Sequence, residues 1–106
     1  MLILPEHIHR KPAEKKILAL GGATLIDYRQ DYVQPVYETC MTQHLLAFVL
    51  AGEKRVHVGG EVLSLWAGEA FFLRRGEYAM SEIAAESGPF SNVLFFLEPA
   101  LIDEFL

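Results

Sequence analysis

Short apolar segments separated by glycine-centred turns run along most of this 106-residue chain. The alternation of polar and apolar positions is clearest in RVHV, residues 55–58, which Gly59-Gly60 follows at once. Two glycines supply the positive φ angles of a two-residue hairpin, and Val62 leads the returning strand. Many short strands with turns of this kind are typical of an all-β barrel or sandwich.

The other apolar segments are also expected to be strands, because each is bounded by turn signals such as Gly21-Gly22 or residues 66–69. Pro35 lacks a backbone donor, so the segment that contains it is expected at an edge or a bend of a sheet. Residues 86–89 are expected to form a loop. The predicted strands are 16–20, 24–29, 33–41, 44–50, 70–74, 78–83 and 92–97.

After Pro99 the apolar spacing changes to that of a helix, with Leu101, Ile102 and Phe105 on one face. Proline suits the first turn of a helix. We therefore expect one domain over residues 1–106, in which 98–106 begin a following helix. A helix this short has little to pack on, so the chain is expected to be a fragment of a longer protein.

Composition and charge narrow the function classes. With 52% hydrophobic and 22% charged residues, the chain can bury a core. The net charge of −5 argues against binding to nucleic acid or an anionic membrane, and the basic residues between Arg10 and Lys16 are expected to be solvated. Cys40 is alone and no run of ~18 apolar residues occurs, so a cytoplasmic location is expected.

A longer block carries a family resemblance. It includes an apolar strand ending at Gly52, the Gly59-Gly60 hairpin, the Gly68-Glu69 pair and the aromatic strand that precedes Arg75-Gly76. The block is HLLAFVLAGEKRVHVGGEVLSLWAGEAFFLRRGEYAMSE, and the ending FFLEPALIDEFL extends the likeness. It resembles the cupin-like N-terminal regulatory domain of AraC/XylS-family transcription regulators, nearest the ExsA-like activators of type III secretion genes.

The resemblance implies a cupin-like antiparallel β-barrel, or jelly roll, in the regulatory part of a bacterial transcription activator. Such domains sense a small molecule or a protein partner, often dimerise, and precede a pair of DNA-binding helix-turn-helix units. These residues contain no helix-turn-helix pattern, so this chain is not expected to contact nucleic acid directly. A stand-alone small cupin that binds a metabolite is the alternative.

Metal and catalytic residues are not expected. Enzymatic cupins hold a metal with two His, a Glu and a third His, whereas this chain offers Glu38 and His44 and has Tyr78 to Met80 in the last place. The pair His7 and His9 lies in an N-terminus that is expected to be mobile. Cys40 has no activating partner nearby in sequence, and no serine lies in a nucleophile-elbow pattern. We therefore expect no enzyme activity and no cofactor.

Two regulatory readings stay open. Strand alternation gives a guess at the inward face, and the polar groups of His44, Tyr78 and Tyr28 could orient an apolar effector there. The guessed inward face is His44, Leu46, Phe48, Leu50, Val56, Val58, Phe71, Leu73, Tyr78, Met80, Val93, Phe95 and Leu97. The candidate ligand-binding residues are His44, Phe48, Tyr78, Met80 and Phe95.

These side chains could also simply fill the core, in which case regulation comes through the surface. A protein partner such as an anti-activator would then bind there, and we favour this second reading. Self-association is expected to be a weak homodimer. Its candidate residues are Leu101, Ile102 and Phe105.

Overall fold

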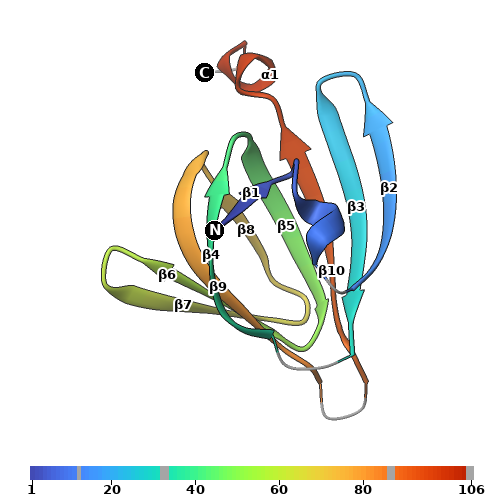
Figure 1. Cartoon of the computed structure of the whole chain (residues 1–106), viewed down its shortest axis with the longest axis vertical. Helices are drawn as coiled ribbons and strands as arrows, with labels where there is room; N and C mark the ends of the chain where they lie inside the picture. The colour runs from blue at the N-terminus through green and yellow to red at the C-terminus, as the bar shows by residue number, and fades with distance from the viewer. Residues whose placement is uncertain (12, 32–33, 86–87, 105–106) are drawn as a thin grey trace.

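The computed structural model describes residues 1–11, 13–31, 34–85 and 88–104. These residues form two five-stranded sheets around a shared core (Figure 1). The first sheet has the order β1-β4-β9-β6-β7 and the second the order β2-β3-β10-β5-β8. The elements are β1 (Leu2–Leu4), η1 (Ile8–Arg10), β2 (Glu14–Leu20), β3 (Ala23–Gln30), β4 (Gln34–Met41), β5 (His44–Ala51), β6 (Glu53–Val58), β7 (Glu61–Trp66), β8 (Ala70–Leu73), β9 (Gly76–Ile83), β10 (Phe90–Leu97) and α1 (Pro99–Asp103).

The all-β class and the expected strands are confirmed, with boundaries that move by a few residues. Gly59 and Gly60 turn the β6–β7 hairpin with φ angles of 56° and 83°. The β4–β9 register shifts between Gln34 and Tyr37, around Pro35, where a bend was expected. Residue 33 of the predicted strand and residues 86–87 of the predicted loop lie outside the described residues.

The expectation of a mobile N-terminus is wrong. Leu2–Leu4 forms β1, which pairs in parallel with Thr39 to Met41 of β4. The side chains of Leu4 and Ile8 are buried in the core. Two buried apolar side chains four residues apart thus attach this segment to the core, with β1 at the edge of the first sheet.

The predicted inward face is correct on some strands and reversed on others. Phe71, Leu73, Val56 and Met80 are buried as expected, but Val58 is 45% exposed. His44 is also buried, but along the rest of β5 and along β10 the alternation is the opposite of the guess. The side chains that point inward there are Leu45, Ala47, Val49, Phe90, Asn92, Leu94 and Phe96.

Apolar residues on both faces explain the reversal. The β5 segment HLLAFVLA and the β10 segment FSNVLFFL carry large apolar side chains at odd and even positions alike. Alternation cannot orient such a strand, because neither face is marked by polar residues. The β5–β10 register also shifts between Ser91 and Asn92, where Ser91 pairs with Ala51 and Asn92 with Val49, so the extra residue is Leu50 of β5.

A glycine joins β5 to β6 where the backbone leaves no room for a side chain. Gly52 has φ +84°, and a Cβ placed on it would lie 2.4 Å from the carbonyl oxygen of Ile83. Gly21 has a similar φ of +56°, but nothing lies within 4 Å of its would-be Cβ. The two glycines therefore share a backbone conformation and differ in their surroundings.

Substitution of Gly52 by alanine is expected to lower the free energy of unfolding by about 3 kcal/mol, because left-handed strain and a backbone clash act together. Gly21→Ala, the matched control, should cost only about 1 kcal/mol from the strain alone. Urea unfolding followed by circular dichroism measures both. Equal losses for the two variants would show that the contact with Ile83 is irrelevant.

Candidate functional site

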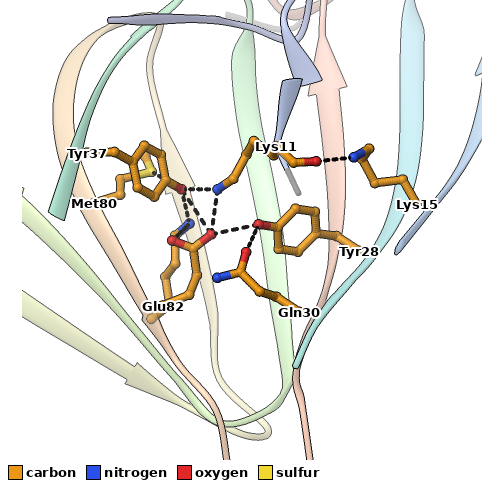
Figure 2. Close-up of polar contacts among 8 residues, drawn as sticks. Lys11, Lys15, Tyr28, Gln30, Tyr37, Met80 and Glu82 are labelled. Carbon is orange, nitrogen blue, oxygen red and sulfur yellow. Dashed lines mark hydrogen bonds and ion pairs between the residues drawn. The ribbon is translucent and has the colours of Figure 1, made fainter. Parts of the chain in front are cut away.

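The centre of the molecule contains a buried group of charged and phenolic side chains, here called the central ion cluster. Its members are Lys11, Tyr28, Tyr37, Lys54 and Glu82. Figure 2 shows that Lys11, Tyr28 and Tyr37 converge on Glu82 from the segment before β2 and from strands of both sheets. Lys54 of β6 contacts the same carboxylate. The two lysines and the glutamate are each at most 5% exposed. Five separate segments therefore meet at one carboxylate.

The carboxylate of Glu82 is held by both lysines. Lys11 Nζ lies 2.6 Å from Glu82 Oε1, and Lys54 Nζ lies 3.5 Å from Oε2. The hydroxyl of Tyr28 is 3.2 Å from Oε1 and also donates to the side-chain oxygen of Gln30. Opposite charges at these distances in a dry interior attract strongly, which offsets much of the cost of removing them from water.

Tyr37 connects the charged groups to one another. Its hydroxyl oxygen accepts from Lys11 Nζ at 2.6 Å and from Lys54 Nζ at 3.1 Å, and its proton is donated to Glu82 Oε1 at 3.0 Å. Lys11 Nζ also lies 3.8 Å from the centre of the Tyr37 ring, close enough for a cation–π contact. One phenol thus uses both lone pairs and its proton inside the cluster.

Local structure places Lys11 in the interior. The Lys11 N–H donates to the carbonyl of Ile8 at the end of η1, and Lys15 Nζ donates to the Lys11 carbonyl. Because Ile8 is itself buried, the chain enters the barrel just before β2 begins. The prediction that the whole basic run is solvated is therefore wrong for Lys11, whose side chain is 4% exposed.

Sequence reasoning missed this site, although part of its signal was present. Lys54 is two residues from Val56 and Glu82 is two residues from Met80, so both charges occupy inward positions of strands. β6 and β9 are neighbours in the first sheet, and Lys54 pairs directly with Glu82. A lysine and a glutamate in phase with core residues on paired strands could have predicted a buried ion pair.

Burial and neighbouring charge shift the ionisation of the cluster. Burial, with the nearby charge of Lys54, lowers the pKa of Lys11 from 10.5 to about 7, although Glu82 opposes the shift. Burial also lowers the pKa of Lys54 and raises that of Tyr37. Burial alone would raise the pKa of Glu82, but Lys54 and Lys11 hold it below its usual value. Near neutral pH the cluster therefore contains an ionised Glu82 and a Lys11 that is close to its midpoint.

Little space remains beside the cluster. The cavity there has a volume of about 10 Å³. The side-chain amide of Asn92 and Glu82 Oε2 make no hydrogen bond within the described residues. This volume corresponds to about one water molecule, whereas sites for small-molecule ligands typically measure about 300–1,000 Å³.

The five candidate ligand-binding residues do not come together. Met80 lies in the core beside Tyr37, and the hydroxyl of Tyr78 donates to the carbonyl of Arg74. The remaining three lie elsewhere. His44 Nδ1 accepts from the Arg75 N–H, and Phe48 contacts Phe95 edge-to-face, at 6.0 Å between ring centres, on the outer side of the second sheet.

Two of the candidate self-association residues, Leu101 and Ile102, lie on α1, which follows β10. Leu101 and Ile102 are half-buried, and Leu101 lies beside Gly22 in the β2–β3 turn. Phe105 lies outside the described residues. Neither helix in the described part of the chain has the length and apolar character needed to cross a bilayer.

The interior does not fit a metal ion. Glu38 lies on β4 of the first sheet and His44 on β5 of the second. Across the described residues, no three His, Cys, Asp or Glu side chains form a group that could hold a metal. The centre is occupied instead by two lysine side chains, and their positive charge opposes a bound cation.

Comparison with solved structures defines the class of fold. A cupin superfamily protein from Desulfitobacterium hafniense is 12% identical with a TM-score of 0.67, and the match covers 83% of this chain and 79% of that one. A protein with a double-stranded β-helix domain from Klebsiella pneumoniae is 15% identical with a TM-score of 0.62, covering 84% and 79%. A protein of unknown function from Rhizobium leguminosarum is 21% identical with a TM-score of 0.65, covering 87% and 88%. The fold is that of the cupins.

The family follows from the sequence itself. The ExsA N-terminal regulatory domain family matches residues 44–106, more than half of the chain. No curated protein matches the chain. The chain belongs to the ExsA N-terminal regulatory domain family, which confirms the resemblance. The chain is therefore a cupin-like regulatory domain of the kind found in transcription regulators.

Removal of the central carboxylate tests whether the cluster holds the fold together. Glu82→Gln removes the counter-charge that opposes the lowering of the pKa of both buried lysines, so each must lose its proton or stay charged in the interior. The free energy of unfolding at pH 7 should therefore fall by about 3–5 kcal/mol. Glu38→Gln, on the exposed side of β4, is the control and should change it by less than about 0.5 kcal/mol. Chemical unfolding of both variants and of the parent protein measures these changes in the free energy of unfolding. A small loss for Glu82→Gln would mean that the lysines are neutral.

The shifted pKa of Lys11 predicts a pH dependence. Between pH 7 and pH 10.5, the ordinary pKa of a lysine, the unfolded chain binds more protons than the folded one, so the free energy of unfolding rises with pH in this window. One such group can change the free energy of unfolding by at most about 1.4 kcal/mol per pH unit. Lys11→Met should flatten the rise between pH 7 and 9 relative to the parent, whereas Lys16→Met, at an exposed position, should leave it unchanged. An equally steep rise without Lys11 would contradict the assignment.

Proposed function

We propose that this chain is the regulatory domain of an AraC-type bacterial transcription activator that responds to protein contacts rather than to a ligand inside its barrel. DNA binding is assigned to helix-turn-helix units elsewhere in the protein, and the chain itself works in the cytoplasm without catalysing a reaction. The membership of the ExsA N-terminal regulatory domain family supports the transcriptional role. The partner would be a second copy or a regulatory protein such as an anti-activator.

The filled interior is the observation that carries the choice of protein contact over ligand. The central ion cluster occupies the place where a ligand would sit, and only about 10 Å³ remains beside it. An effector of drug-like size would have to displace Lys11 and break its contacts with Glu82 and Tyr37, leaving buried charge uncompensated.

The position of the large apolar side chains also supports this proposal. Phe48 and Leu50 are 40% and 55% exposed on the outer side of the second sheet. Phe95 lies beside Phe48 on the same side. Apolar surface that faces outward serves recognition by another macromolecule, whereas a ligand-sensing barrel concentrates it inside.

Paired substitutions in the native regulator gene separate the two readings. Phe95→Glu places a charge on the outer surface, and it should change transcript levels of the regulated genes at least about fivefold, equivalent to about 1 kcal/mol of coupling. Met80→Leu alters the interior with little change of volume, and it should leave those levels within about twofold. Quantitative RNA measurement, normalised to regulator protein on immunoblots, reports both. A response to Met80→Leu alone would favour the small apolar effector and overturn the proposal.

A further inference from the structure

The inward face of β10 carries an amide among large apolar side chains. Asn92 lies between Phe90 and Leu94 on that face and is 1% exposed. Neither its amide oxygen nor its amide nitrogen makes a hydrogen bond within the described residues. A buried amide without partners costs free energy that a leucine of similar volume does not, because the amide gives up its hydrogen bonds to water. In native interiors such groups are bonded either to protein or to an ordered water.

A carboxylate oxygen of the central ion cluster also lacks a hydrogen bond. Glu82 Oε2 has none within the described residues, although Lys54 Nζ forms an ion pair with it at 3.5 Å. The other oxygen, Oε1, accepts from Lys11, Tyr28 and Tyr37. Hydrogen bonds from the protein are thus concentrated on one oxygen of the carboxylate, and acceptor capacity remains on the other.

The amide and the carboxylate meet at one small cavity. Asn92 pairs with Tyr28 on the neighbouring strand β3, and the Tyr28 hydroxyl reaches Glu82. Asn92 and Glu82 both line the cavity of about 10 Å³ beside the central ion cluster. That volume is at the lower limit for one water molecule, so it excludes any larger group.

The kinds of atom around the cavity select its ligand. The amide nitrogen of Asn92 is a donor, whereas Asn92 Oδ1 and Glu82 Oε2 are acceptors. A metal cation would leave the donor unbonded and would be repelled by Lys11 and Lys54, which also line the cavity. An anion would leave both acceptors unbonded and would be repelled by the ionised Glu82. Water has two protons for the two oxygens and a lone pair for the N–H, so one water molecule matches all three atoms.

We propose that one water molecule is bound in this cavity as an integral member of the central ion cluster, where it bridges the amide of Asn92 to Glu82 Oε2. An amide carries its oxygen and one N–H along the same edge, so a single water can bond to both. Three hydrogen bonds are the usual number for a buried water. The water joins β10 of the second sheet to β9 of the first, in addition to the contact that Tyr28 makes. This inference does not depend on the proposed function.

The walls of the cavity predict that this water exchanges slowly. Leu4, Ile8 and Lys11 of the N-terminal segment line it, and each is at most 6% exposed. A water molecule behind them can leave only when this segment or a neighbouring strand moves. It therefore stays longer than the protein takes to rotate, which distinguishes it from surface hydration.

A crystal structure of the chain at about 1.2 Å resolution tests the inference directly. One peak of electron density should lie about 2.6–3.2 Å from both amide atoms of Asn92 and from Glu82 Oε2. A direct hydrogen bond between Asn92 and Glu82, with no density between them, overturns the inference. An anomalous signal at this position after soaking with bromide also overturns it, because the ligand is then an anion.

Oxygen-17 relaxation dispersion of the solvent, recorded over a range of temperatures, counts such long-lived waters in solution. Asn92→Leu removes the amide and should lower the count by one relative to the parent protein. Ser91→Leu, at the adjacent half-buried position of β10, is the matched control and should leave the count unchanged. An unchanged count in Asn92→Leu, or an equal loss in both variants, contradicts the inference. If circular dichroism shows that Asn92→Leu does not fold, the crystal structure of the parent decides alone.

Discussion

The structure depends on one carboxylate between two ammonium groups. Glu82 lies on β9 in the middle of the first sheet, and it is contacted by Lys54 from the neighbouring strand and by Lys11 from the N-terminal segment. Tyr28 extends the same network to the second sheet. Apolar packing selects which face of each strand points inward, and an ion cluster adds the requirement that each of its members lies at a defined position. The cluster therefore fixes how the sheets and the N-terminal segment meet.

The same cluster changes what the cupin fold can be used for. In a barrel with a histidine-lined centre, the interior is where a metal or ligand is recognised. Here the centre is filled by the chain's own side chains, with Lys11 supplied from a segment outside the main strands. Because no cavity of ligand size is present, no aromatic side chains are needed to line one. The large aromatic residues Phe48, Phe72 and Phe95 lie on the outer side of the second sheet. The interior stabilises the fold, and the outer surface is the part for which we propose a role in recognition.

The strands and turns could be predicted from the sequence because their signals are local. The Gly59-Gly60 hairpin, the turn at Gly68 and the bend at Pro35 each follow from the backbone preferences of single residues. The inward face of β5 and β10 could not be predicted, since residues such as Leu45 and Leu46 are chemically equivalent and only the opposite sheet selects between them. The candidate site was missed because the partner of Lys11 is 71 residues away, and a basic run near a chain end ordinarily lies in water.

That separation has a consequence for how the protein is made. Lys11 leaves the ribosome long before Glu82, so during synthesis it stays hydrated and positively charged. Only when β9 joins the first sheet can the ammonium group exchange water for its carboxylate and phenol partners. Because its pKa falls to about 7 at that step, completion of the barrel releases a fraction of a proton at neutral pH. Lys11 is thus among the first residues to be made, but it can reach its carboxylate partner only after residue 82 has been made.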